Sequence, residues 1–197
     1  MAGSPFRVLL LVILIVSPLT LCCCSSSPQT LQRFEYAQII MGIEARIILY
    51  APEESVARSA ARSAFDRMVR LESAMSDYRL DSELMRVCES GEGGKPVSIS
   101  DDLYRVLDRA RSFSEATDGA FDVTIGPVVQ LWRDARRSGA LPAPKAISRA
   151  QEAVGWKNLI LEPESRTIRF QRPGMRLDLG GIGKGFAADE AMAVLID

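Results

Sequence analysis

The chain has 197 residues and a formal net charge of −1, so even after removal of a targeting segment of about thirty residues it can form one domain with a hydrophobic core. Its 24 basic and 25 acidic residues are interspersed, which excludes the basic stripe typical of nucleic-acid-binding proteins. It contains no histidine, which excludes a Ser-His-Asp hydrolase and a His-ligated zinc site within this chain. Any metal must therefore be a hard cation bound by oxygen atoms, such as Mg²⁺ or Ca²⁺.

The N-terminus has the pattern of a secretory signal. Arg7 precedes an apolar run, 8–16, which is shorter than the roughly 20 residues that a membrane-spanning helix needs. Three consecutive cysteines follow this run. Cys24 has Leu21 three places before it and a small residue directly before it, so it is the best candidate for the acylated cysteine of a bacterial lipoprotein.

We therefore expect three parts along the chain. Residues 1–24 are predicted to be a signal peptide with a lipoprotein-type cysteine, residues 25–33 a flexible tether, and residues 34–197 the domain. A plain cleaved signal and an uncleaved anchor are the alternatives to lipidation. If the lipid is attached at Cys24, Cys88 is the one remaining thiol of the mature domain and is expected to be a small buried apolar residue.

Hydrophobic periodicity and turn residues predict both helices and strands along the domain. Residues 34–50 predict β structure, in which Gly42 suggests a bulge or a close approach of the backbone. Helices are predicted to begin at Pro52-Glu53, at Ser82, and at Ser100 with an end near Ala116, and to cover 128–136 after Pro127 and 148–154. Further β structure is predicted as a short strand at 96–99, a hairpin at 159–170 and a strand at 175–179. This order indicates an α+β (mixed α/β) fold and not a regular βαβ repeat.

The segment 177–189 is the most informative stretch. Four glycines surround Lys184, Asp178 precedes them, and a helix-forming run follows. A strand, a glycine-rich turn and a helix N-terminus together direct free N–H groups at an anion, so the segment indicates a phosphate-bearing ligand. It is neither a Walker loop nor a dinucleotide fingerprint, because Gly185 replaces the Ser or Thr of the first and Phe186 replaces the third glycine of the second. A tight turn without a ligand is the alternative.

Four short blocks carry a resemblance to a known family. They are Met41-Gly42; Ser76-Asp-Tyr78 before Ser82-Glu83-Leu84; Thr117-Asp-Gly-Ala-Phe-Asp122 with Thr124, Gly126-Pro127 and Leu131-Trp132; and Leu177-Asp-Leu-Gly-Gly-Ile-Gly-Lys-Gly-Phe-Ala-Ala-Asp189. Each block is weak by itself, but their order resembles that of the FAD:protein FMN transferases, the ApbE-type family of flavin transferases, over about 34–197. The resemblance implies an ApbE-like flavin transferase domain.

For function, the resemblance implies a magnesium-dependent enzyme of the bacterial cell envelope. It would split FAD and attach FMN through its phosphate to a Thr or Ser hydroxyl of a target flavoprotein. Such a phosphoryl transfer does not require a histidine. The lipid would anchor the protein to a membrane, with the periplasmic side of the inner membrane as the expected location. The alternatives are a non-catalytic lipoprotein that binds FAD, an FAD pyrophosphatase that gives FMN and AMP, and a structural protein without a ligand.

The family pattern also implies site residues, although it identifies no catalytic residue. FAD contacts are implied at Met41, Tyr78, Ala120, Phe121, Asp122, Asp178 and Lys184, and a metal contact at the backbone carbonyl of Gly181. A polarisable sulfur and an aromatic face suit a flavin ring, and a lysine suits phosphate. Alternatively, Tyr78 is an ordinary loop residue, Phe121 belongs to the core and Asp122 is a turn or cap residue.

Two departures from the family pattern stand out. The family often has Thr after Met-Gly, where this chain has Ile43. Its remaining metal ligands, an Asp and an Asp-Thr pair, would follow Asp197, at which the chain ends within an expected amphipathic helix without a glycine C-cap. We therefore expect an incomplete fragment, truncated on its C-terminal side. Because a hard cation takes six or more oxygen ligands, this chain is expected to bind Mg²⁺ poorly and to turn over little.

Overall fold

The computed structural model describes residues 30–91 and 94–196. The predicted signal segment and Cys24 lie outside these residues. Residues 31–197 form a unit by themselves, and its first strand begins at Gln32, so the last two residues of the predicted tether belong to that strand. Within the described part of the chain, no helix is both long and apolar enough to cross a membrane.

The unit begins with an antiparallel hairpin of β1 (Gln32–Ile40) and β2 (Ile43–Ala51). The two residues between the strands, Met41 and Gly42, have φ angles of 53° and 71°. Positive φ at both central residues is the requirement of the type I′ turn, whose twist matches that of the flanking strands. The prediction of β structure is confirmed, but Gly42 forms the hairpin turn and not a bulge.

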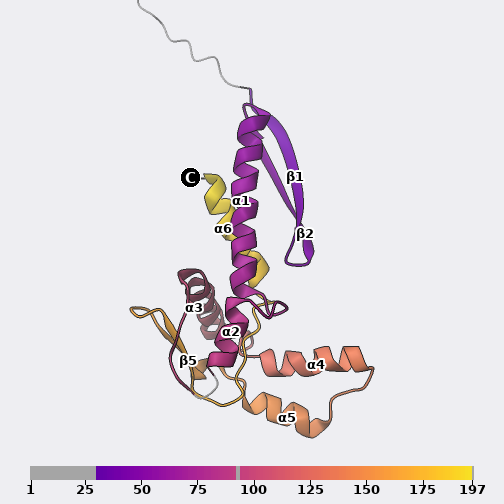
Figure 1. The fold of residues 1–197 in the computed structure, drawn as a ribbon, viewed down its shortest axis with the longest axis vertical. Helices are drawn as coiled ribbons and strands as arrows, with labels where there is room; N and C mark the ends of the chain where they lie inside the picture. Colours follow the sequence, from indigo (N-terminus) through magenta and orange to yellow (C-terminus); the bar gives the residue numbers. More distant parts are fainter. Residues whose placement is uncertain (1–29, 92–93, 197) are drawn as a thin grey trace, which may run out of the picture. The chain divides into compact units, whose positions relative to one another are not determined.

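The helix α1 (Glu54–Met75) packs between this hairpin and α6 (Gly183–Ile196), as Figure 1 shows. A helix was predicted to begin at Pro52-Glu53, and α1 begins directly after these residues, at Glu54. Apolar side chains of the hairpin, α1 and α6 form one buried cluster, which comprises Ile40, Ile47, Ala61, Ala64, Phe65 and Ala191. The expectation of an amphipathic last helix is only partly met, because α6 buries Phe186 and Ala187 but exposes Met192 and Ile196.

A second, larger cluster lies around α2 (Glu83–Ser90) and α3 (Asp101–Ala116). The hydroxyls of Ser82 and Ser100 accept hydrogen bonds from the third residue beyond each, which confirms both predicted helix starts. The three-stranded antiparallel sheet has the order β3 (Val97–Ser98), β5 (Thr167–Phe170), β4 (Leu159–Glu162). The predicted hairpin at 159–170 and the short strand before α3 are thus confirmed.

The remaining helices are α4 (Gly126–Ser138) and α5 (Pro144–Glu152), with a 3₁₀ turn, η1 (Trp156–Asn158), after them. The predicted helix after Pro127 is confirmed, and α5 begins four residues before the predicted 148–154. At the start of α4, a Cβ added to Gly126 would lie 2.7 Å from the carbonyl oxygen of Arg176. Glycine therefore permits the close approach of α4 to the segment that precedes α6.

The predicted strand at 175–179 is wrong. This segment belongs to no strand, and within the described part of the chain it makes one isolated parallel bridge, between Ile125 and Arg176. The N–H of Asp178 donates to the carbonyl of Val123 at 2.8 Å, and that of Leu177 donates to Cys88 Sγ at 3.4 Å. The thiol of Cys88 is buried as predicted, and this burial raises its pKa.

Charged side chains connect α6 to α1 and α3. Arg67 of α1 donates to both carboxylate oxygens of Asp102 at 2.6 Å and also to Glu190 of α6, to which Arg105 of α3 donates as well. The side chains of Arg67 and Glu190 are only 13% and 12% exposed. This network and the two apolar clusters fix α6, and with it the glycine segment at its start, relative to α1. The mixed α+β class predicted from the sequence is confirmed.

Candidate functional site

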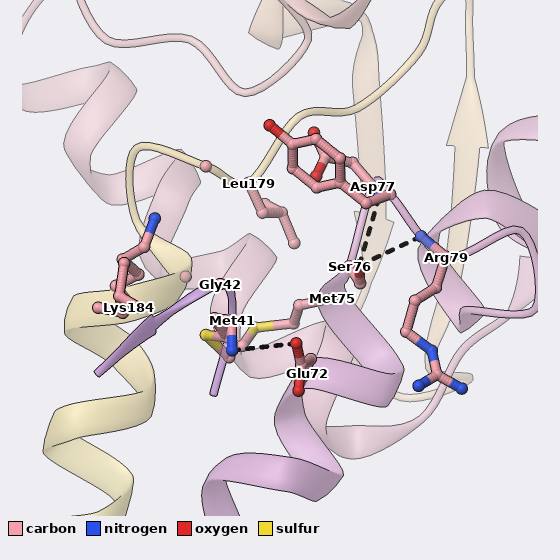
Figure 2. A pocket seen from close by; sticks show the side chains of 13 residues that line it. Met41, Gly42, Glu72, Met75, Ser76, Asp77, Arg79, Leu179 and Lys184 are labelled. Carbon is pink, nitrogen blue, oxygen red and sulfur yellow. Dashed lines mark hydrogen bonds between the residues drawn. The ribbon is translucent and has the colours of Figure 1, made fainter. Parts of the chain in front are cut away.

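A pocket of about 460 Å³ lies between the hairpin turn, the end of α1, the loop 76–79 and the start of α6. Figure 2 shows Met41, Met75 and Lys184 around it. Its lining residues are Met41, Gly42, Ile43, Glu72, Met75, Ser76, Asp77, Tyr78, Arg79, Leu179, Gly180, Gly183 and Lys184. Its volume lies in the range of small-molecule sites, and segments far apart in the sequence form its walls.

The wall at the hairpin turn is fixed by one hydrogen bond from the backbone. The N–H of Met41 donates to Glu72 Oε1 at 3.0 Å, as the dashed line in Figure 2 marks. Because Glu72 lies in the last turns of α1, this bond connects the turn to the helix that forms the pocket's other side. Met41 is half-buried and contacts both apolar clusters.

The loop after α1 presents Tyr78 at the rim of the pocket. The hydroxyl oxygen of Ser76 accepts hydrogen bonds of 3.3 Å from the N–H groups of both Tyr78 and Arg79, which gives the loop its turn. The Tyr78 side chain is 79% exposed. The guanidinium carbon of Arg133, from α4, lies 4.4 Å from the centroid of the Tyr78 ring.

The same guanidinium joins two carboxylates. Arg133 donates to Asp77 and, at 3.0 Å, to Asp178 Oδ2. The other oxygen of Asp178 accepts from the N–H of Gly180 at 2.8 Å. Burial is the main cause that raises the pKa of Asp178, and the neighbouring Asp77 raises it further, whereas Gly180 and Arg133 act in the opposite direction.

Lys184 lies in the first turn of α6, and that turn contains no acidic side chain. Its side chain is exposed and borders the pocket. The N-terminus of a helix carries a partial positive charge and free N–H groups, to which the lysine adds a full charge. This end of the pocket therefore suits an anion, as the sequence predicted for the glycine segment.

The predicted residues Ala120, Phe121, Asp122 and Gly181 do not line this pocket. Phe121 packs edge-on against Phe113, with 6.0 Å between ring centroids, and a Cβ on Gly181 would lie 3.2 Å from the Phe121 ring. Gly181 lines a smaller cavity of about 240 Å³ on the α3 side of the segment. Ala120 is exposed beside them.

Asp122 directs its carboxylate into the protein. Oδ1 accepts from the N–H and the hydroxyl of Thr124, at 2.8 and 2.6 Å, and Oδ2 accepts from the N–H of Trp156 at 2.9 Å. Thr124 in turn accepts a hydrogen bond from the N–H of Gly155 at 2.8 Å. Both oxygens of Asp122 therefore hold the turn before α4 against the 3₁₀ turn.

The described residues do not fit a Mg²⁺ site. In residues 30–91 and 94–196, no group of three or more His, Cys, Asp or Glu side chains is placed to hold a metal ion. The carbonyl of Gly181 would be a single ligand, and a hard cation takes six or more. The structure thus brings Met41, Tyr78 and Lys184 to one pocket, whereas Asp178 does not line it but accepts a hydrogen bond from Gly180, which does.

Sequence reasoning missed Arg133, Asp77 and Glu72. Arg133 is one of three arginines in α4, and nothing in its local pattern separates it from Arg136 and Arg137. Its partners are 45 and 56 residues away in the sequence. The available signal was Asp77 next to Tyr78 together with the predicted site residue Asp178, because two carboxylates withdrawn from water need a cation.

The chain is similar to flavin transferases in sequence and fold. A model of the ApbE family matches residues 41–197. Proteins named FAD:protein FMN transferase include one from Klebsiella pneumoniae, 31% identical over 79% of this chain and 48% of its own length, and one from Treponema pallidum, 29% identical over 83% of this chain and 47% of its own length. The chain therefore spans about half the length of these curated relatives.

Two solved structures have the same fold over most of this chain. The ApbE protein from Thermotoga maritima has a TM-score of 0.74 and 26% identity, over 84% of this chain and 53% of its own. The flavin transferase ApbE from Vibrio cholerae also has a TM-score of 0.74, with 23% identity, over 85% of this chain and 54% of its own. The match to the family model covers most of the residues described above, and the chain belongs to the ApbE family.

Proposed function

We propose that this chain provides the FAD-binding wall of an FAD:protein FMN transferase. In the proposed reaction, the hydroxyl oxygen of a Thr or Ser in a target flavoprotein attacks the phosphorus of the FMN half of FAD. A phosphoester bond to FMN forms, the pyrophosphate bond breaks, AMP leaves, and the hydroxyl proton passes to solvent or a base. The chemistry is a phosphoryl-type transfer, in which positioning and charge stabilisation do most of the work.

One observation carries this proposal. A single pocket is lined by a thioether and an aromatic ring, those of Met41 and Tyr78, and by the cationic start of α6 with Lys184. FAD likewise combines a flat π system with a charged pyrophosphate. In the proposed complex, Met41 and Tyr78 contact the flavin, Lys184 contacts a phosphate oxygen, and Asp178 accepts a hydrogen bond at the edge of the pocket.

Binding of FAD is tested by titration of the purified 197-residue chain, with quenching of flavin fluorescence as the readout. We expect Lys184→Met to weaken FAD binding more than binding of riboflavin, which lacks phosphate. Lys145→Met is the matched control, because Lys145 is also exposed but lies on α5 away from the pocket. Equal loss of riboflavin and FAD affinity in Lys184→Met would contradict a phosphate contact.

A second candidate, FAD binding without transfer, is favoured by the lack of a metal-ligand cluster in residues 30–91 and 94–196. When bound, Mg²⁺ would neutralise pyrophosphate charge. We propose that these residues do not hold it tightly and that the 197-residue chain transfers little FMN. The test is incubation with FAD, Mg²⁺ and a Thr-containing target protein, followed by detection of covalent flavin fluorescence after denaturation. Appreciable flavinylation would refute this, and free FMN with AMP would identify a pyrophosphatase.

We also propose that the protein is a lipoprotein of the bacterial envelope, acylated at Cys24 and held at the periplasmic side of the inner membrane. The support is the sequence pattern alone, since Cys24 lies outside the described residues. Mass spectrometry of the protein from a bacterial host should detect acyl chains on the mature N-terminus, and Cys24→Ser should move the protein out of the membrane fraction. A non-acylated N-terminus would contradict the lipoprotein proposal and would indicate a plain cleaved signal or an uncleaved anchor.

A further inference from the structure

One side chain outside the predicted site contacts three groups at the pocket. Arg133 stacks on the ring of Tyr78 and donates hydrogen bonds to Asp77 and Asp178. These groups come from the loop after α1 and from the segment before α6, whereas Arg133 belongs to α4. Because Arg133 touches both of these segments, its position decides how they lie relative to each other.

The charges show why this contact requires an arginine. The side chains of Asp77 and Asp178 are 12% and 11% exposed, and that of Arg133 is 24% exposed. A carboxylate removed from water to this extent is costly unless a cation or hydrogen-bond donors compensate it. The planar guanidinium has several donors, so it can serve two carboxylates and still present a face to an aromatic ring, which a lysine cannot do.

The stacking also restricts Tyr78. A tyrosine ring that is 79% exposed on a loop would ordinarily move between rotamers, and a ligand would have to immobilise it on binding. With the guanidinium against one face of the ring, its plane is already set before a ligand arrives. The oxygen Oδ2 of Asp178 is similarly held by Arg133, while Oδ1 is held by Gly180.

We propose that Arg133 is a positioning residue of the pocket, which holds the Tyr78 ring and the Asp178 carboxylate in the orientation that a flat ligand with hydrogen-bond donors meets. This inference rests on the proposed function, in which that ligand is the flavin of FAD. Arg133 acts through Tyr78 and Asp178 and does not need to touch the ligand itself.

The test compares Arg133→Lys with the parent chain. The lysine keeps the positive charge beside the carboxylates but removes the planar group over the ring. We expect the thermal midpoint to change little and the Kd for FAD to rise roughly threefold to tenfold, with weaker quenching of flavin fluorescence. Arg137→Lys is the matched control, because Arg137 lies on the same helix, is 70% exposed and, within the described residues, has Asp134 as its ion-pair partner.

A double-mutant cycle separates positioning from a general structural role. Because Arg133 is proposed to act through Tyr78 as well as Asp178, the effect of Arg133→Lys on the Kd for FAD should become smaller when Tyr78 is replaced by Leu, which leaves only the contact with Asp178. The same factor in both backgrounds overturns the proposal, as does an Arg133→Lys variant that binds FAD like the parent.

A second readout does not depend on FAD. The NMR signals of the Tyr78 ring should shift in Arg133→Lys and remain unchanged in Arg137→Lys. If the parent chain binds no FAD, the proposed function fails, while these signals still decide whether Arg133 orients the ring. Unchanged ring signals overturn the positioning role even in a chain that binds FAD.

Discussion

The backbone N–H of Met41 donates a 3.0 Å hydrogen bond to the carboxylate of Glu72, 31 residues further along the chain. The donor lies in a left-handed turn and the acceptor in the last turns of a long helix. Strands β1 and β2 are otherwise held to α1 by apolar contacts, which have no preferred direction. Among the residues that the structure describes, this polar contact is the one that gives the hairpin turn a defined position over the pocket.

We predict that Glu72→Ala lowers the free energy of unfolding by about 1 to 2 kcal/mol, because it leaves the Met41 N–H without its acceptor. FAD affinity should fall as well, since Met41 is then free to move. Glu72→Gln keeps an acceptor and should cost less. Glu54→Ala is the control on the same helix, where the carboxylate pairs with Arg58 in solvent and a loss below roughly 0.5 kcal/mol is expected. Urea denaturation measures all three, and equal losses for Glu72→Ala and Glu54→Ala contradict the role of the bond.

The structure makes Asp122 a structural residue, so its removal should act first on stability. Asp122→Ala deprives Thr124 and the N–H of Trp156 of their acceptor, and we expect the free energy of unfolding to fall by roughly 2 kcal/mol or more. Asp122→Asn keeps one carbonyl oxygen and should lose less. Chemical denaturation and FAD titration are measured together. A variant Asp122→Asn of parental stability that no longer binds FAD would indicate a direct contact with the ligand.

The parts of the fold that the sequence predicted have local causes. The starts of α2 and α3 follow from serine caps, and that of α4 follows from a proline in its first turn. Met41 and Tyr78 were placed together only through the family resemblance. The structure adds the physical reason, since the hairpin turn and the loop after α1 both lie at the same end of that helix.

The predictions that were wrong rest on sequence patterns that fit two different local conformations equally well. A glycine within a β-like run fits a bulge as well as a turn, and a Met at φ 53° is an uncommon conformation that composition does not signal. Alternation of Met175, Leu177 and Leu179 is typical of a strand, but here it only buries the three side chains in the core. The role of Arg133 could not be predicted because it depends entirely on distant segments.

The raised pKa of Asp178 predicts a pH dependence of stability. Because the pKa in the folded state lies above the ordinary value of 3.8, the folded state binds this proton more tightly than the unfolded state. Stability from this group is present below pH 3.8 and is lost as the pH rises through the folded-state value. Asp178→Asn cannot ionise, so its stability relative to the parent should increase as the pH is raised from about 4 to 7.

Denaturation series of both proteins at several pH values measure this difference, in which the titration of all other groups largely cancels. Since Arg133 lowers the pKa of Asp178, the increase should be larger when both proteins also carry Arg133→Met. A difference that does not vary with pH, or a decrease, contradicts a raised pKa.

The glycine segment allows stability and ligand binding to be separated at one position. Gly185 is the third residue of α6, and a Cβ added there would meet no atom within 4 Å. Alanine is the better helix former, so Gly185→Ala should stabilise the fold by up to about 1 kcal/mol. If phosphate approaches the backbone at the start of α6, the added methyl group should weaken FAD binding while riboflavin binding changes less.

Gly126→Ala is the contrasting variant, because its Cβ would lie 2.7 Å from the carbonyl oxygen of Arg176 and should destabilise the fold. A Gly185→Ala chain that is more stable and binds FAD like the parent would show that phosphate does not approach α6 at Gly185.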